Sequence, residues 1–341
     1  MNLDFFGLRE QPFGVTPDPK FLYLSRAHRE ALASLFYGIE SGRGFLSLIA
    51  PPGMGKTTLL FHLLNKLRRN TRTAFIFQTQ CSSREFLRLL LADLGCDRGD
   101  QDFVRMHEEF NRRLLQEARS GNRLIVMIDE GQNLDASVLE TVRLLSDFET
   151  PQAKLMQIVL VGQPELAAKL ASSDLVQLRQ RISIMAGLEP LSHDEVVNYI
   201  EHRLGVAGYT GGTMFTSQAL AALSDLSQGV PRNINNYCFN ALSVAFALKR
   251  KTIDLAILSE VASDLDFTRF VSGNRSSNLD AMAPVLADSW VPANFATSAH
   301  ALTAQTAVDL AGVDEAREYL SEVVRSLKRP ANASPVSRSL Q

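Results

Sequence analysis

Cysteine and tryptophan are scarce in this sequence of 341 residues, which contains three cysteines and one tryptophan. The cysteines, Cys81, Cys96 and Cys238, form no C-x-x-C pair, and no His or Cys cluster accompanies them. An odd number of scattered cysteines argues against a disulfide framework, a cysteine-based metal site and a cysteine nucleophile. We therefore expect free thiols in the reducing environment of the cytosol.

Segments that direct a chain into or across a membrane are also missing. The N-terminal stretch MNLDFFGLREQPF has no basic start followed by an apolar run, so it is not a signal peptide. No stretch approaches the ~18 uncharged apolar residues of a membrane span. The nearest candidate, ALSVAFAL, ends at Lys249, Arg250 and Lys251 and predicts a buried helix. The sequence therefore indicates a cytoplasmic protein without a membrane span.

Neither sign of charge dominates. Lys and Arg number 35 and Asp and Glu number 37, which gives a formal net charge of -2. The overall charge thus gives no argument for a nucleic-acid partner, although a local basic run can still bind one. Because 45% of the residues are hydrophobic and 21% are charged, the chain can bury a sizeable core. Its length suggests about two domains.

Residues 1–188 alternate apolar, strand-like runs with helical patterns. This alternation predicts an α/β domain with a parallel sheet. The runs show no polar alternation, which is typical of strands covered on both faces. They lie at residues 45–50, 73–79, 124–129, 157–162 and 182–188. The helical segments between them lie at residues 56–69, 84–94, 102–119 and 135–148.

Residues 189–266 have a helical pattern throughout and predict a small helical domain. Ser192 followed by Glu195 is a capping-box pattern that marks the start of its first helix.

Residues 267–341 are rich in Ser, Asn, Ala and Pro and predict a flexible tail that includes Trp290. One amphipathic helix is expected in the tail at about residues 306–328. It either docks on a partner or is a loosely folded helix, and it carries the apolar residues Val313, Ala316, Leu320, Val323 and Leu327.

The stretch APPGMGKTTLL at residues 50–60 nearly matches the phosphate-binding pattern G-x-x-x-x-G-K-[ST], with Ala50 at the first position. In such a loop, successive backbone N–H groups and the following helix N-terminus bind phosphate oxygens. Lys56 can reach the β and γ phosphates, and Thr57 offers a hydroxyl to Mg²⁺. Alanine costs little at the end of a strand if its φ is negative, so we expect an intact loop. The expected binding residues are Pro52, Gly53, Met54, Gly55, Lys56, Thr57 and Thr58.

A second half of the same site follows in LIVMIDEGQNLD, an apolar strand that ends in Asp129 and Glu130. Mg²⁺ prefers oxygen ligands and keeps several waters, so one carboxylate near the phosphates suffices. Asp129 fits that role together with Thr57. Glu130 can polarise the attacking water, and a protein that only senses nucleotide would not need it.

Phosphoryl transfer also requires positive charge at the γ phosphate. Arg179 and Arg181 in QLRQRI and Arg232 in GVPRNIN are candidates, and Gln163 in VGQPEL can contact both water and phosphate. Each of these residues alone equally fits an ordinary surface, helix-end or turn position.

These residues, in this order, resemble the AAA+ superfamily. More narrowly, the sequence resembles the general secretion pathway protein A (ExeA-like) ATPases and their soluble relatives encoded near exosortase and polysaccharide-export genes. The resemblance spans about residues 4–240. The strings that carry it are FFGLREQPFGVTPDPKFLYLSRAHREAL, IDEGQNLD, LETVRLLSDFET, QIVLVGQPEL, LRQRI and GVPRNINNYC.

The resemblance implies a five-stranded parallel sheet of order 5-1-4-3-2 with a helical lid, and ATP and Mg²⁺ as ligands. It implies that Gln163 is a first sensor, that Arg232 is a second sensor in the lid, and that Arg179 or Arg181 is an arginine finger. The segment 21–29 matches the region beside the adenine, where we interpret His28 as a capping or packing residue.

The chain departs from the family in three places. Ala50 replaces the first loop glycine, and Gly131 stands where many relatives have Ala, which we expect only to loosen the turn after Glu130. The membrane helix and peptidoglycan-binding region of the secretion protein have no counterpart here, so peptidoglycan binding is not carried over.

The first functional hypothesis is an oligomeric cytoplasmic ATPase whose active site is shared between subunits. It would drive or regulate assembly of a secretion or exopolysaccharide-export machine, peripheral at the inner membrane through its partners. A less favoured alternative is a DNA-linked ATPase of the transposition-helper type, with KLRRNTR at residues 66–72 and KRK at residues 249–251 as basic candidates. A third hypothesis is an ATP-dependent signalling switch.

Overall fold

The computed structural model describes residues 3–67, 70–77, 79–96, 102–149 and 154–265. The chain divides into two units, Met1–Leu258 and Ser259–Gln341, and only residues 259–265 of the second unit are described. The predicted tail at residues 267–341, its helix at 306–328 and Trp290 lie outside the described residues.

A five-stranded parallel sheet has the order β2-β3-β4-β1-β5. This is the predicted order 5-1-4-3-2 read from the other edge, so the prediction is confirmed. Each strand begins or ends within two or three residues of an expected apolar run. Their bounds are β1 Phe45–Ile49, β2 Thr71–Ile76, β3 Arg123–Ile128, β4 Met156–Gly162 and β5 Ile182–Gly187.

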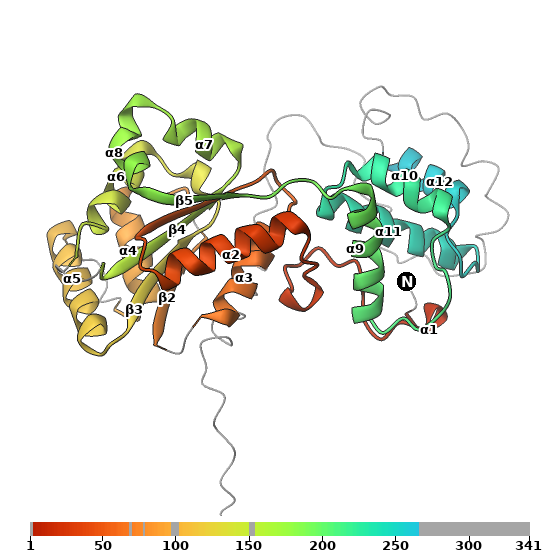
Figure 1. Cartoon of the computed structure of the whole chain (residues 1–341), viewed down its shortest axis with the longest axis horizontal. Coiled ribbons are helices and arrows are strands. Elements are labelled where there is room, and N and C mark those ends of the chain that lie inside the picture. The colour runs from red at the N-terminus through yellow and green to blue at the C-terminus, as the bar shows by residue number, and fades with distance from the viewer. Residues whose placement is uncertain (1–2, 68–69, 78, 97–101, 150–153, 266–341) are drawn as a thin grey trace, which may run out of the picture. The chain divides into compact units, whose positions relative to one another are not determined.

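Helices cover both faces of this sheet (Figure 1). Alternate residues of a strand point to opposite faces, so Val126 and Ile128 join a core with α4, α5 and α6, whereas Ile125 and Met127 face the other side. That other side carries α2 and α3, which contact each other. The bounds are α2 Arg26–Glu40, α3 Lys56–Lys66, α4 Ser83–Asp93, α5 Phe103–Arg119 and α6 Ala136–Leu145.

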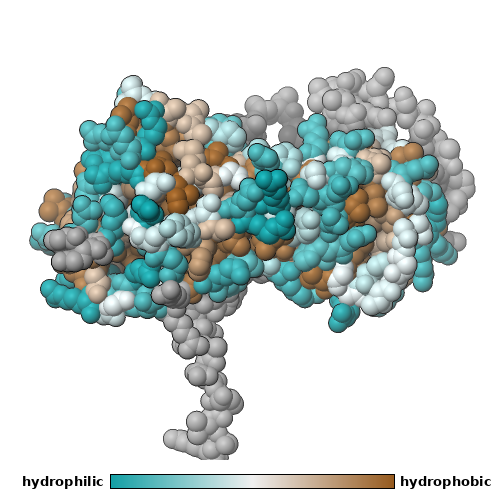
Figure 2. All heavy atoms as spheres, in the orientation of Figure 1, coloured by the Kyte–Doolittle hydropathy of each residue, from teal (hydrophilic) through white to brown (hydrophobic). Residues whose placement is uncertain are grey.

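The expectation that all five runs are covered on both faces is wrong for β5. Ser183, Met185 and Gly187 alternate with more buried residues, and Met185 is 59% exposed. β5 lies at an edge of the described sheet, and the face with its more buried residues packs on α2, where a Cβ on Gly38 would meet Ile184. In Figure 2, apolar side chains of the visible face include a patch in the region of this strand.

Helices follow β4 and β5 as well. The capping box predicted at Ser192 and Glu195 is present at the start of α9, where both reciprocal hydrogen bonds form. The helices after β4 are α7 Pro164–Leu170 and α8 Val176–Arg181, joined by η3 Ser173–Leu175. Those after β5 are α9 His193–Val206, α10 Ser217–Ser227, α11 Pro231–Ala247 and α12 Leu255–Asp264.

Short helices complete the described elements. They are α1 Leu3–Phe6, η1 Pro19–Phe21 and η2 Gly131–Asn133. Cys81, Cys96 and Cys238 form no disulfide among the described residues. Burial raises the pKa of the Cys238 thiol. Within the described ranges, every helix is too short or too polar to cross a bilayer.

Candidate nucleotide-binding site

The loop between β1 and α3 has the backbone of a phosphate-binding turn. Gly53 and Gly55 adopt positive φ angles of 79° and 82°, which favour glycine. Ala50 is not among the described residues with positive φ, and its N–H donates to the Gly162 carbonyl oxygen at 3.1 Å. Alanine at the first position therefore continues the strand pairing with β4, and the backbone there does not require glycine.

Lys56 begins α3 and points back into the loop. Its Nζ donates to the carbonyl oxygens of Ala50 at 2.9 Å and Pro51 at 3.1 Å. Burial lowers the pKa of Lys56, while Glu130 and Asp129 act in the opposite direction. The loop thus holds a buried ammonium group at the N-terminus of α3, a position where an anion is stabilised.

Thr57 and Asp129 meet across the sheet edge, as the sequence predicts for a shared magnesium site. The Thr57 hydroxyl donates to Asp129 Oδ2 at 2.6 Å, and the Glu130 N–H donates to Asp129 Oδ1 at 2.9 Å. Burial is the largest influence on Asp129 and raises its pKa, although the Thr57 hydrogen bond lowers it. A hydroxyl and a buried carboxylate are oxygen donors of the type that Mg²⁺ takes, so these residues fit that ion.

Glu130 follows Asp129 in a strained conformation, with φ 52° and ψ 39°. Left-handed geometry in a non-glycine residue costs about 1–2 kcal/mol. The turn is held because Thr79 Oγ1 donates to the Glu130 carbonyl oxygen at 3.0 Å. Gly131 does more than loosen this turn, which corrects the expectation. A Cβ there would lie 2.8 Å from Leu160 Cδ1 and 3.1 Å from the Val161 carbonyl oxygen.

The Glu130 carboxylate accepts two amide hydrogen bonds. Gln132 Nε2 donates to Oε2 at 2.5 Å, and Gln163 Nε2 donates to the same oxygen at 3.1 Å. Gln163 precedes α7 at the end of β4, so the structure brings it to Glu130. Gln132 lies in IDEGQNLD but was not among the predicted site residues. Its Oε1 also accepts from the Gln163 N–H at 3.0 Å, which ties the two strand ends together.

Arg232 lies in the first turn of α11, next to the loop. Its backbone N–H donates to the Gly53 carbonyl oxygen at 3.1 Å. A Cβ on Gly53 would lie 2.9 Å from the Arg232 Cβ and 3.1 Å from Val230 Cγ1. The start of α11 therefore packs directly against the phosphate-binding loop.

Substituting Gly53 by Ala tests this close packing. An alanine in left-handed geometry costs about 1–2 kcal/mol. We expect Gly53→Ala to lower the free energy of unfolding by more than this, because the added methyl group also meets α11. Gly42→Ala is the matched control, since Gly42 has a φ of 68° with nothing within 4 Å of an added Cβ. Urea unfolding of both variants measures the difference, and equal losses would contradict the packing argument.

One pocket gathers most of the predicted site residues within the unit Met1–Leu258. It also contains residues that the sequence argument missed, which come from the segment before η1 and from α9 and α11. The predicted residues in its lining are Pro52, Gly53, Met54, Gly55, Lys56, Thr57, Thr58, Glu130, Gln163 and Arg232. The missed residues are Gly14, Val15, Thr16, Pro17, Asp18, Tyr199, Arg203, Pro231 and Asn235.

A buried polar network supports the missed side of the pocket. Arg203 NH1 donates to the Tyr199 hydroxyl at 2.8 Å, and that hydroxyl donates to Asn235 Oδ1 at 2.8 Å. Arg203 Nε also donates to the Pro12 carbonyl oxygen at 2.5 Å, and Asn235 Nδ2 donates to the Gly14 carbonyl oxygen at 3.3 Å. Pro12, Gly14 and Asn235 lie in strings that carry the family resemblance, which was the available sequence signal, but their contacts with Tyr199 and Arg203 are set by the tertiary structure.

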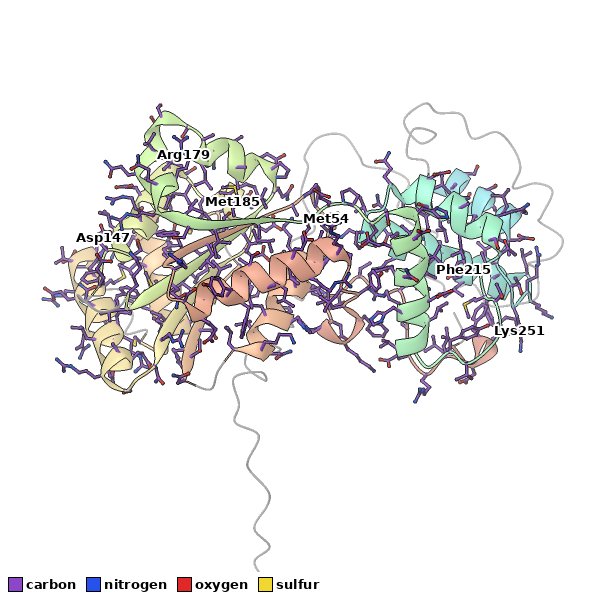
Figure 3. The ribbon with its side chains drawn as sticks, in the orientation of Figure 1. Met54, Asp147, Arg179, Met185, Phe215 and Lys251 are labelled. Carbon is purple, nitrogen blue, oxygen red and sulfur yellow. The ribbon has the colours of Figure 1, made fainter. Side chains whose placement is uncertain are left out.

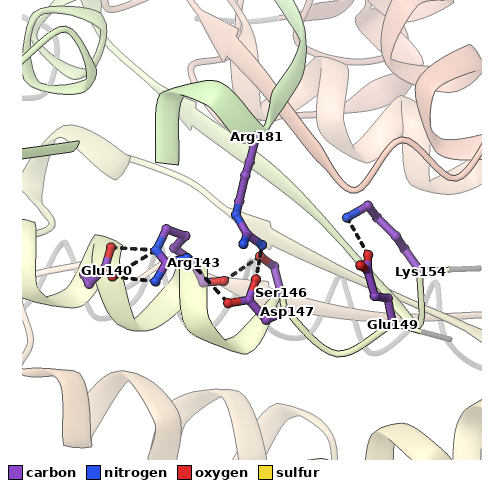
Figure 4. Close-up of polar contacts among 7 residues, drawn as sticks. All are labelled: Glu140, Arg143, Ser146, Asp147, Glu149, Lys154 and Arg181. Carbon is purple, nitrogen blue, oxygen red and sulfur yellow. Dashed lines mark hydrogen bonds and ion pairs between the residues drawn. The ribbon is translucent and has the colours of Figure 1, made fainter. Parts of the chain in front are cut away.

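Arg179 and Arg181 do not line the pocket of their own chain. Both lie in α8, and Figure 3 shows Arg179 well apart from Met54 of the loop. Arg179 is exposed, and its NH1 donates to the Ala171 carbonyl oxygen at 3.1 Å. Arg181 forms an ion pair with Asp147, which also pairs with Arg143 (Figure 4).

The basic candidates for DNA binding are partly engaged in other contacts. Arg250 pairs with Asp254 at 2.6 Å, and Lys251 Nζ lies 5.8 Å from the centre of the Phe5 ring. The other run, at residues 66–72, is only partly within the described residues. Nucleic-acid binding stays a prediction.

Comparison with known proteins agrees with this geometry. A family model described as an AAA domain matches residues 39–170. General secretion pathway protein A of Aeromonas hydrophila is 43% identical over 249 residues, which are 72% of this chain and 45% of that protein. The chain spans about half the length of the curated relatives it matches, with shares of 45%, 38% and 54%.

Solved structures share the fold. The Aeropyrum pernix ORC2 protein in ADPNP-ADP complexes has a TM-score of 0.55 and 17% identity, and the match covers 75% of this chain and 72% of that one. Drosophila ORC bound to DNA has a TM-score of 0.57 and 16% identity, with 82% and 70% covered. The sheet order, the domain match and the 43% identity together show the family of this chain. The chain belongs to the AAA+ P-loop NTPases, in the family of general secretion pathway protein A.

Proposed function

We propose that this chain binds ATP with Mg²⁺ and hydrolyses it. The observation that carries the proposal is the 2.6 Å hydrogen bond from the Thr57 hydroxyl to Asp129, which joins the two residues that we propose as magnesium ligands. The ADPNP-ADP complexes of the structurally similar ORC2 protein support adenine nucleotides as the ligand class. We assign residues 1–188 to the ATPase core, 189–266 to a helical lid and 267–341 to a tail.

Each side chain in the pocket has a distinct chemical task in this proposal. Lys56 and the N–H groups of the loop bind phosphate oxygens. Thr57 and Asp129 would hold Mg²⁺, which when bound would neutralise phosphate charge. Glu130 accepts a proton from the attacking water, and Gln163, which holds the Glu130 carboxylate, orients that water. Arg232 acts as a second sensor because its helix contacts the loop at Gly53.

The active site is completed by a second copy of the chain in this proposal. Arg179 and Arg181 do not line the pocket, so neither can serve the nucleotide bound to its own chain without a rearrangement. An arginine finger supplied by a neighbour raises phosphoryl-transfer rates by about 10³–10⁵. We therefore assign the finger to Arg179 or Arg181, acting on the adjacent subunit.

The test is ATP turnover as a function of protein concentration. We expect turnover per subunit to rise steeply as subunits associate, because a lone subunit lacks the finger. Mixing Glu130→Gln subunits with finger variants (Arg179→Ala or Arg181→Ala) sharpens the test. The Glu130→Gln subunit keeps the finger arginine, and the finger variant keeps Glu130. If the substituted arginine is the finger, the two inactive proteins should therefore regain activity when mixed. Turnover per subunit that is independent of concentration would rule out the shared site.

The cellular role that fits best is to drive or regulate assembly of an envelope machine that secretes protein or exports polysaccharide. The 43% identity to general secretion pathway protein A supports this assignment over the matched 249 residues. The protein would then work on the cytoplasmic side and reach the inner membrane through its partners.

A further inference from the structure

His28 is a buried side chain outside the nucleotide-binding set, yet it contacts the phosphate-binding loop. It lies in the first turn of α2 and is 3% exposed. Its Nε2 is 3.1 Å from the carbonyl oxygen of Met54, and its Nδ1 is 2.7 Å from the Ser25 hydroxyl. Both ring nitrogens are therefore occupied, one by the loop and one by the cap of its own helix.

The partners determine which nitrogen carries the proton. The Met54 carbonyl can only accept, so Nε2 must be the N–H of the ring. Nδ1 of the neutral ring then accepts from the Ser25 hydroxyl, whose oxygen accepts from the His28 backbone N–H at 3.3 Å. Burial lowers the pKa of His28, while the Met54 carbonyl and Glu195 raise it to a lesser extent. A neutral ring satisfies every polar atom in this group.

The hydrogen bond from His28 to the Met54 carbonyl oxygen orients the whole Met54–Gly55 peptide unit. The Met54 carbonyl and the Gly55 N–H belong to one planar, trans peptide unit, so they point in opposite directions. Holding the carbonyl toward His28 therefore turns the Gly55 N–H away from the ring. Gly55 is the N-cap of α3 and has a φ of 82°, a conformation that glycine adopts without steric cost. The hydrogen bond from His28 favours one orientation of the adjoining Met54–Gly55 peptide.

The ring is itself held in place from a second direction. The backbone N–H of Arg26 donates to Glu195 Oε1 at 3.0 Å, and Glu195 also caps the start of α9. The first turn of α2 is thus attached to α9 on one side and to the loop on the other. A shift of the whole turn would therefore disturb its contacts with both α9 and the loop.

We propose that His28 is a positioning residue that sets the orientation of the Met54–Gly55 peptide, so that the Gly55 N–H is presented to the phosphates of a bound nucleotide. This inference rests on the proposed nucleotide binding. It assigns His28 to the geometry of the loop, where the sequence argument gave it only capping or packing.

The test compares three substitutions in the full chain, by titration with ATP and Mg²⁺ and by thermal melting without nucleotide. His28→Phe fills the ring volume but has no donor. His28→Gln places an amide N–H where Nε2 stood, and His28→Asn keeps an amide that is too short to reach Met54. We expect Phe and Asn to weaken nucleotide binding about tenfold, because one oriented hydrogen bond to an anion is lost. Gln should restore most of the affinity.

The outcomes separate this inference from the function beneath it. If the wild-type protein fails to bind ATP with Mg²⁺, the proposed function fails. If the wild type binds and His28→Phe binds equally well, only the role of His28 is overturned. Equal weakening by His28→Gln and His28→Phe would also overturn it. If His28 only fills space, a side chain with an N–H donor should restore no affinity. Should the Phe variant not fold, the Asn and Gln pair decides, and equal affinities of these two would refute the inference.

Discussion

Replacing Lys56 by Ala is expected to weaken ATP binding about 10- to 100-fold, because a charged hydrogen bond to phosphate contributes about 1.5–3 kcal/mol. Lys56 is buried, and its Nζ already lies within 3.1 Å of two loop carbonyl oxygens. Burial lowers the pKa of Lys56, which means that desolvation of its charge opposes the gain from these two hydrogen bonds in the free protein. The free Lys56→Ala variant should therefore melt near the wild-type temperature.

Thermal melting with and without nucleotide measures this effect. At a ligand concentration 100 times the wild-type Kd, binding stabilises the wild type by about 2.7 kcal/mol, and the same concentration should stabilise Lys56→Ala by only about 0.4–1.4 kcal/mol. Lys66→Ala is the matched control, since Lys66 is an exposed lysine at the other end of α3. If Lys56→Ala keeps full affinity, the loop is not the phosphate site and the proposed function is wrong.

Replacing Glu130 by Gln is expected to lower the ATP turnover number by about 10²–10⁴, the usual contribution of a general base. The change keeps the size of the side chain but removes its basicity. Nucleotide affinity should persist, because binding depends on Lys56, Thr57 and the loop. Single-turnover phosphate release together with a binding titration separates the two quantities.

An exposed acidic residue provides the control for this substitution. Glu201 lies on the exposed side of α9, so Glu201→Gln should leave both turnover and affinity unchanged. Turnover that survives Glu130→Gln would favour the signalling-switch hypothesis, in which nucleotide binding alone carries the response. A collapse of turnover with intact binding supports a hydrolytic motor.

The fold was predictable because its main determinants are local. Apolar runs of strand length that alternate with helical patterns already predicted a parallel sheet, and the similarity to AAA+ sequences supplied its order. The expectation that β5 is covered on both faces was wrong because the exposure of a strand face depends on how the sheet and helices assemble. The apolar run ISIMAGL contains no residue pattern that shows which of its two faces stays exposed.

The sequence alone determined the phosphate-binding loop, since Gly53, Gly55, Lys56 and Thr57 lie within one short turn and their spacing dictates the chemistry. Tertiary structure decided which distant groups support that turn. Gln132 accepts a hydrogen bond from the Gln163 backbone, Arg203 of α9 donates to Pro12, and His28 of α2 contacts Met54 in the loop. A hydrogen bond between residues far apart in the chain depends on how the elements pack, and no local pattern encodes that.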